Sequence, residues 1–187
     1  MTGGPREARP TRDRERTRGQ VLDAAEELIA AQGTAASIAA VAARAGVSKS
    51  GLLHHFPSRD ALLLAVAERG LQGLVDEVDR HLDPADEAPG RRTRAYVRAL
   101  CGGSATAAAL FSPTALLNAL LDVPGAEALV RADAEHWRRW FADDGLPAAR
   151  HLVVRHAAEG LAAASTVPPY LSADELAAAR EALLQLT

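Results

Sequence analysis

Apolar residues recur every three or four positions along most of the chain, and this spacing is typical of amphipathic helices. The first clear run is Val21, Leu22, Ala25, Leu28 and Ile29, and Gly33 ends the helix that it predicts. No segment shows the strict alternation of apolar and polar residues that indicates a β-strand. The pattern therefore predicts an all-α protein.

Helix-capping serines and helix-breaking glycine and proline residues divide the region after Gly33 into several helices. Ser37 is a good N-cap for a helix that Gly46 stops, and Ser48 can cap a third helix that runs to about His55. Pro57 closes that helix, and Ser58 begins a long one over 59–82. Beyond a loop at 83–90, the spacing predicts helices at 91–102, 104–111, 114–122, 126–142, 148–165 and 173–186.

These elements suggest three regions. Residues 1–12 are rich in glycine, proline and arginine, which predicts a disordered basic arm. Residues 13–58 hold the first three helices, and residues 59–187 form a larger helical region that begins with the long helix 59–82. The N-terminal arginines, Arg6 to Arg18, are either a solvated tail or an arm that contacts DNA.

Charge is distributed unevenly along the 187 residues. The net charge of −3 would by itself argue against nucleic-acid binding. However, residues 1–60 hold nine basic and seven acidic side chains, while residues 61–187 hold twelve basic and seventeen acidic ones. The N-terminal part is therefore mildly basic and the C-terminal part is acidic. A single cysteine, Cys101, excludes an internal disulfide. With no targeting segment or membrane span visible, we expect a cytoplasmic protein.

The stretch GVSKSGLLHHFP, residues 46–57, holds the only lysine. Two short helices joined by a glycine-containing turn form a helix-turn-helix, whose second helix enters the DNA major groove with its N-terminus first. Lys49 adds positive charge there, Ser48 and Ser50 offer hydroxyl donors, and Gly51 permits close approach of the backbone. These four residues are therefore candidate DNA contacts.

At these residues the sequence resembles the tetracycline-repressor (TetR) family. The resemblance runs from about Thr17 to Leu63 and rests on Gly33, Ala42, the segment from Ala45 to Ser48, His55, Phe56 and Leu62. It implies that Ser37 and Arg59 touch phosphate, that Leu52 and His54 lie on or near the groove face, and that His55 ends the recognition helix. The family usually has tyrosine at position 53; here Leu53 stands there, and we expect Leu53 and Phe56 to be core residues.

Most aromatic residues lie in the acidic C-terminal part of the chain, residues 61–187. They could form either a packed core or a cavity, and the resemblance favours a cavity for a small-molecule inducer. The candidate lining is Tyr96, Phe111, Leu117, Leu121, Trp137, Trp140 and Phe141. An aromatic or cationic ligand would suit such a site if one of the nearby acidic residues Asp122, Glu127, Asp133 and Glu159 lay beside it.

The last two predicted helices carry stripes of small apolar residues. The resemblance implies that two such helices from each of two subunits form a four-helix bundle, so that the protein is a homodimer. The expected interface residues are Ala157, Ala158, Leu161, Leu176, Ala179 and Leu183.

The preferred function is a DNA-binding transcriptional regulator, a repressor released from double-stranded operator DNA by a small molecule. An activator and a helical interaction protein with a vestigial helix-turn-helix remain alternatives. An enzyme is not expected, because no nucleophile–base pair or phosphate loop is recognisable. Neither a metal nor a cofactor is expected: His54 and His55 diverge on a helix, and His151 and His156 are five residues apart.

Overall fold

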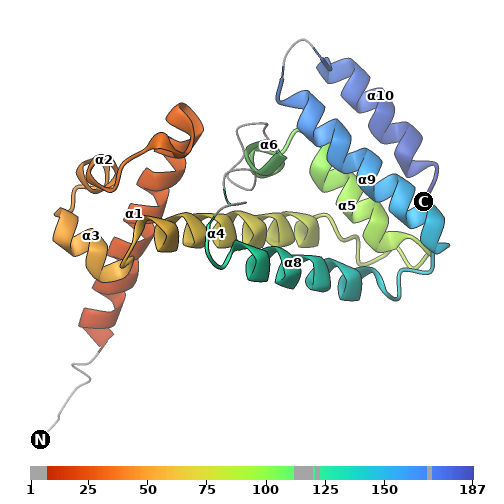
Figure 1. Cartoon of the computed structure of the whole chain (residues 1–187). Coiled ribbons are helices and arrows are strands. Elements are labelled where there is room, and N and C mark those ends of the chain that lie inside the picture. Colours follow the sequence, from red (N-terminus) through yellow and green to blue (C-terminus); the bar gives the residue numbers. More distant parts are fainter. Residues whose placement is uncertain (1–7, 112–119, 121–122, 168–169) are drawn as a thin grey trace, which may run out of the picture. The chain divides into compact units, whose positions relative to one another are not determined.

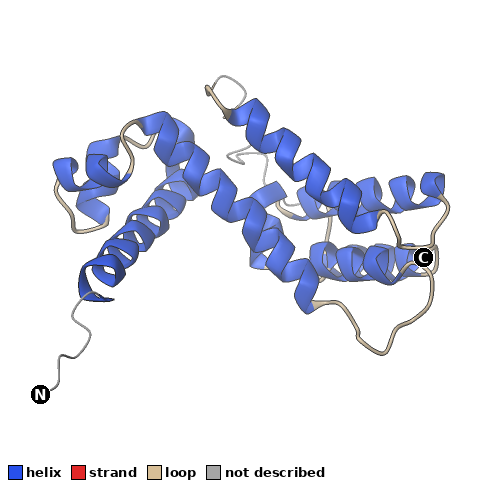
Figure 2. Cartoon of the chain, turned by 90° about the horizontal axis from the view of Figure 1, so that it is seen from below, coloured by secondary structure: helices blue, strands red, loops and turns tan. Residues whose placement is uncertain are grey.

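The computed structural model describes residues 8–111, 120, 123–167 and 170–187, and it is helical throughout that part of the chain (Figures 1 and 2). This confirms the all-α fold. The helix expected at 114–122 lies almost entirely outside the described residues. The chain divides into two compact units, residues 1–66 and 67–187, whose boundary falls inside the long fourth helix rather than at its start.

Unit 1 holds helices α1 (Ala8–Gln32), α2 (Ile38–Arg44) and α3 (Lys49–His55), a short 3₁₀ turn η1 (Gly33–Ala35), and the first turns of α4 (Arg59–Arg80). Helix α1 already begins at Ala8, so residues 8–12 are helical where disorder is expected. Pro10 is compatible with this start, because proline is tolerated in the first turn of a helix.

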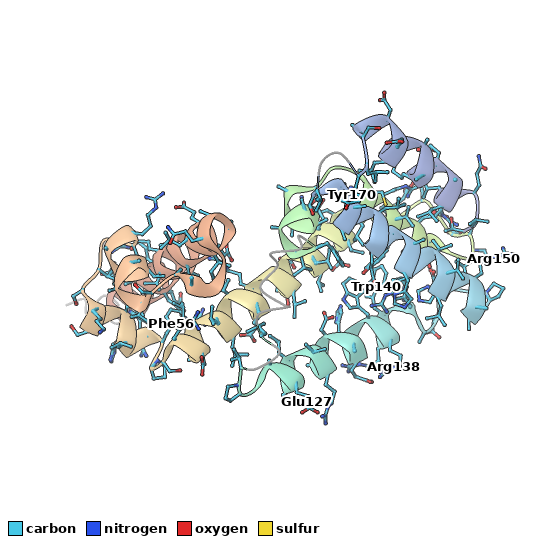
Figure 3. All side chains as sticks on the ribbon, turned by 45° about the horizontal axis from the view of Figure 1, so that its top comes forward. Phe56, Glu127, Arg138, Trp140, Arg150 and Tyr170 are labelled. Atoms are coloured by element: carbon cyan, nitrogen blue, oxygen red, sulfur yellow. The ribbon has the colours of Figure 1, made fainter. Side chains whose placement is uncertain are left out.

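The core of unit 1 joins all four helices. Apolar side chains that are almost fully buried come from α1, α2, α3, its C-cap and α4; they are Val21, Leu22, Ala25, Ile29, Val41, Ala42, Leu52, Phe56, Leu62, Leu63 and Val66. Figure 3 marks Phe56 in this unit. Burial of these side chains is the main force that holds the short helices α2 and α3, which would not be stable alone.

Unit 2 is built around α5 (Arg91–Cys101), which is buried along most of its length. Helices α9 (Ala148–Ser165) and α10 (Ala173–Leu184) pack against it and against each other, and α6 (Ala105–Phe111) and α8 (Ala126–Phe141) also contact this layer. In Figure 1, α9 and α10 lie side by side over α5.

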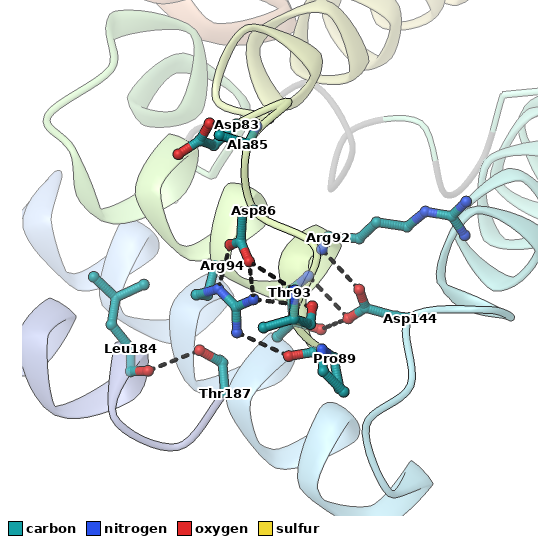
Figure 4. Close-up of polar contacts among 11 residues, drawn as sticks. Asp83, Ala85, Asp86, Pro89, Arg92, Thr93, Arg94, Asp144, Leu184 and Thr187 are labelled. Atoms are coloured by element: carbon teal, nitrogen blue, oxygen red, sulfur yellow. Dashed lines mark hydrogen bonds and ion pairs between the residues drawn. The ribbon is translucent and has the colours of Figure 1, made fainter.

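A residue far along the chain completes the first turn of α5. Gly90, at the N-cap, has no side chain that could accept a hydrogen bond. The Asp144 carboxylate takes this role: Oδ1 accepts from the Arg92 backbone N–H at 2.7 Å, and Oδ2 accepts from that of Thr93 at 3.0 Å (Figure 4). Nearby, Arg94 forms two hydrogen bonds of 2.7 Å with Asp86, and they lower the pKa of that carboxyl.

Candidate nucleic-acid interface

The turn between α2 and α3 is set by Gly46, whose φ of +69° is a left-handed conformation that favours glycine. The Gly46 N–H donates to the Ala43 carbonyl at 3.2 Å, and the Val47 N–H donates to the Ala42 carbonyl at 3.0 Å. This pair of bonds is the Schellman motif, which ends a helix by satisfying its last carbonyls. The chain can therefore start α3 after only four intervening residues, 45–48.

Serine caps begin three successive helices of unit 1. The Oγ atoms of Ser37, Ser48 and Ser58 accept backbone N–H groups of the first turns of α2, α3 and α4 at 3.0–3.1 Å. Each oxygen then acts as an acceptor toward its own helix. The Ser37 hydroxyl proton is still able to donate to a phosphate oxygen, so capping is compatible with the DNA contact expected there.

Helix α3 has a buried face and an exposed face. Leu52 and the adjoining Phe56 are 0% and 2% exposed, whereas Lys49, Ser50 and His54 are exposed. No acidic residue occurs between Lys49 and His55. The structure thus brings the candidate contacts Lys49, Ser50 and His54 together on one face.

The structure reverses the burial expected for two neighbouring leucines of α3, Leu52 and Leu53. Leu52, expected on or near the groove face, is fully buried, so it supports α3 from inside and cannot reach DNA. Leu53, expected in the core, is 36% exposed and lies on the same side of α3 as Lys49. Phe56 is buried as predicted.

Further positive charge lies beside the end of α3. The Arg18 guanidinium lies 5.0 Å from the centre of the Phe56 ring, within cation–π range. Partial burial lowers the pKa of His55, and the nearby charges of Arg14, His54 and Arg18 lower it further. Arg14 and Arg18 therefore belong to this basic surface, and they come from a described helix rather than from a free arm.

The aromatic residues of unit 2 form a packed cluster. Tyr96 and Trp137 are each 1% exposed, with ring centres 5.0 Å apart, and Phe141 lies 5.4 Å from Tyr96. Trp140, labelled in Figure 3, stands edge-on to Phe141 at 4.8 Å. Leu117 and Leu121 lie outside the described residues. The core interpretation therefore holds for Tyr96, Trp137 and Phe141 as described, while Phe111 and Trp140 are only partly buried.

Two carboxylates lie at the edge of this cluster. Burial raises the pKa of Asp133, although the Trp137 side chain hydrogen-bonds to it. Burial would also raise the pKa of Glu159, but hydrogen bonds from His156, Tyr96 and Arg155 outweigh it and lower that pKa. Close by, His136 Nε2 is buried and has no hydrogen-bond partner among the described residues. Glu127, by contrast, is exposed and paired with Arg131.

The expected dimer residues divide into two groups. Ala158, Leu176 and Leu183 are buried in the core of their own unit, so they do not present themselves to a partner. Ala157, Leu161 and Ala179 are only partly buried. The larger apolar groups on the outside of α9 are Leu152 and Val153, which are 50% and 64% exposed. Apolar residues occupy more than one side of α9, so the spacing of apolar residues does not by itself indicate which side is exposed.

A metal site, a membrane span and a surface pocket each require particular features of the described residues. No three His, Cys, Asp or Glu side chains of that part of the chain are grouped to hold a metal ion. None of the described helices combines the length and hydropathy that a membrane crossing needs. An open hollow of about 410 Å³ lies between the 86–92 and 143–145 segments, and its polar lining includes both aspartates that hold α5.

A capped helix-turn-helix followed by a separate helical unit is the construction of a two-part transcriptional regulator. Residues 21–66 match the family model described as "Bacterial regulatory proteins, tetR family", and residues 90–187 match "Tetracyclin repressor-like, C-terminal domain". The chain belongs to the tetR family of bacterial regulatory proteins.

Individual relatives agree with this assignment. The "HTH-type transcriptional activator FasR" of Mycolicibacterium smegmatis is 41% identical over 87 residues, which are 46% of this chain and only 39% of FasR. Two structures of the "multidrug binding protein EbrR" are 25% identical. The imidazole complex covers 90% of this chain and 93% of EbrR with a TM-score of 0.64; the ethidium complex covers 91% and 98% with a TM-score of 0.66.

A transcriptional regulator from Rhodococcus sp. Rha1 shares the fold more closely. Its TM-score is 0.75 at 19% identity, over 90% of this chain and 94% of that one.

Proposed function

We propose that the protein is a homodimeric repressor that binds operator DNA through α2 and α3 and leaves it when a small molecule binds to unit 2. The observation that carries the proposal is the exposed face of α3, which holds Lys49, Ser50 and His54 and no carboxylate. Serine caps and the glycine turn fix this face on a buried core. A rigid polar and basic face of this kind suits entry into the major groove.

The test is the salt dependence of binding to duplex DNA, measured by fluorescence anisotropy. Sequences selected from a random library with the full-length protein serve as probes, and a scrambled duplex serves as control. We expect preference for the selected duplex and a linear fall of log K with log salt, because each phosphate contact releases counterions. Absence of any selected sequence, or binding that ignores salt, would contradict the proposal.

The proposed dimer interface lies on the exposed side of α9 and α10. Leu152 and Val153 would meet their counterparts there, with Ala157, Leu161 and Ala179 at the edges. Burial of such exposed apolar side chains is the usual source of association energy. A dimer also presents two recognition helices, which matches a palindromic operator.

The proposed inducer site lies beside the aromatic cluster, near Asp133 and Glu159. Aromatic rings attract cations and a carboxylate neutralises them, so an aromatic or cationic compound suits this region. EbrR, a relative at 25% identity, forms complexes with imidazole and with ethidium, and this supports the choice of ligand class. Such a ligand would act by favouring a conformation that binds the operator weakly.

Two alternatives make different predictions. FasR is named an activator, so a reporter gene under the selected operator decides the sign of regulation: a repressor lowers transcription and an activator raises it. A helical interaction protein would bind no preferred duplex. As a regulator of DNA, the protein would act in the cytoplasm, with neither an enzymatic activity nor a cofactor.

A further inference from the structure

Leu53 is a surface residue that the DNA-binding role of α3 leaves unexplained. Within the described part of unit 1, it is the one large apolar side chain that is exposed; the others are buried or half-buried. Its neighbour Leu52 already fills the core position on this turn. Leu53 is therefore not needed to hold α3 in place.

The neighbours of Leu53 show what it faces. Lys49 and Ser50 precede it by one turn on the same exposed side, and His54 follows it. No acidic residue lies on α3, and Arg14 and Arg18 add positive charge near the helix end. The face that presents Leu53 is therefore complementary to a polyanion rather than to an apolar protein surface.

We propose that Leu53 reads the C5-methyl group of a thymine in the major groove, an inference that rests on the DNA-binding function proposed above. A leucine side chain has no donor or acceptor, so it cannot distinguish bases by hydrogen bonds. The thymine methyl is the apolar group that base pairs present in the major groove, and contact with it is an established mode of base recognition.

The position of this thymine relative to the Lys49 contact follows from helix geometry. Four residues advance an α-helix by about 6 Å, and successive bases along a strand lie about 3.4 Å apart. Lys49 can donate to the acceptors of guanine. A guanine contacted by Lys49 and this thymine should therefore lie within about two base pairs of each other.

The experiment replaces each thymine of the selected duplex, one position at a time, by deoxyuridine in both half-sites. This change removes the methyl group and keeps every Watson–Crick hydrogen bond. Loss of one apolar carbon contact weakens binding about four-fold, so two symmetric losses should weaken it roughly fifteen-fold. We expect this at one position of the half-site for the wild-type protein.

The variant Leu53→Ala should bind the thymine and deoxyuridine duplexes with nearly equal affinity. Val130→Ala, which shortens an exposed apolar side chain on α8, should keep the wild-type difference. The thymine-to-deoxyuridine ratio within one variant is the readout, so a general weakening of Leu53→Ala does not affect it. Circular dichroism checks that this variant retains its helices.

Two results would overturn the inference while DNA binding itself stands. One is a wild-type protein that shows no methyl dependence at any thymine of the selected duplex. The other is a methyl dependence that persists in Leu53→Ala. Failure of the wild-type protein to select any duplex would instead reject the proposed function.

Discussion

Thr93 and Asp144 lie 51 residues apart in sequence and share two hydrogen bonds in the buried interior of unit 2. The Asp144 carboxylate accepts both the backbone N–H and the hydroxyl of Thr93. Because that hydroxyl has only one proton, Nδ1 of His151, 3.1 Å away, must be the donor toward Thr93. Three helices or their ends thus meet in one polar chain: α5, the end of α8 and α9.

Asp144→Ala removes this cap and leaves two backbone donors of α5 without their acceptor. Unsatisfied buried donors are costly, so we expect the free energy of unfolding of unit 2 to fall by about 3 kcal/mol. Trp137 and Trp140, both in unit 2, report its unfolding by fluorescence in urea. Asp143→Ala is the matched control, because Asp143 is exposed; its effect should stay within about 0.5 kcal/mol. Equal midpoints for the two variants would contradict the capping role.

Gly46→Ala should destabilise unit 1, because the left-handed conformation at Gly46 costs an L-residue about 1–2 kcal/mol. Gly19→Ala is the control, since Gly19 lies inside α1 without the strained φ, and neither position has an atom within 4 Å of an added Cβ. Alanine at position 19 should instead stabilise by up to about 1 kcal/mol. Calorimetry measures both shifts, and equal signs for the two variants would disprove this account of the turn.

Lys49→Ala should weaken binding to every duplex and reduce the salt slope by about one unit if Lys49 contacts phosphate. If it contacts a guanine, the variant should instead lose preference at that base pair. Arg131→Ala provides a control of equal charge change on an exposed, paired arginine of unit 2. Anisotropy titrations at several salt concentrations distinguish these outcomes, and an unchanged affinity and specificity would exclude Lys49 from the interface.

Val153→Glu should yield a monomer, because it places a charge on the exposed side of α9 proposed as the dimer interface. Val130→Glu, at a similarly exposed valine of α8, should remain a dimer. Light scattering coupled to gel filtration gives the mass of each species. A wild-type protein that is monomeric at micromolar concentration, or a dimer that tolerates Val153→Glu, would reject this interface. Leu183→Glu is a poor test, since Leu183 is buried and its loss would disturb the fold.

Acid should destabilise unit 2 through His151. Burial lowers the pKa of this imidazole below 6.5, and Arg155 lowers it further. Below pH 6.5 the unfolded chain therefore binds more protons at this position than the native one, so stability falls as the pH falls from 6.5 toward the native pKa. His151→Asn retains an N–H donor but does not titrate, and it should flatten this part of the pH profile. An unaltered profile would show that His151 contributes nothing to it.

The sequence predicts local features of this fold well and distant ones poorly. Ser37, Ser48 and Gly46 act within a few residues of themselves, so their roles are visible in the sequence. The cap at Asp144 is not visible, because it depends on tertiary contact. Helix phase is also uncertain in a helix of seven residues with adjacent leucines, and this is why Leu52 and Leu53 exchange places. The side of α9 that is exposed is hard to predict for a similar reason, since α9 is apolar on several sides.

The capping of α5 by Asp144 also bears on how the chain is made. During synthesis, α5 leaves the ribosome about fifty residues before the side chain that completes its first turn, and α9, which packs along it, follows later still. Long-range contacts of this kind form slowly, because the intervening loop must close first. The buried face of the nascent α5 therefore stays uncovered until the last helices emerge.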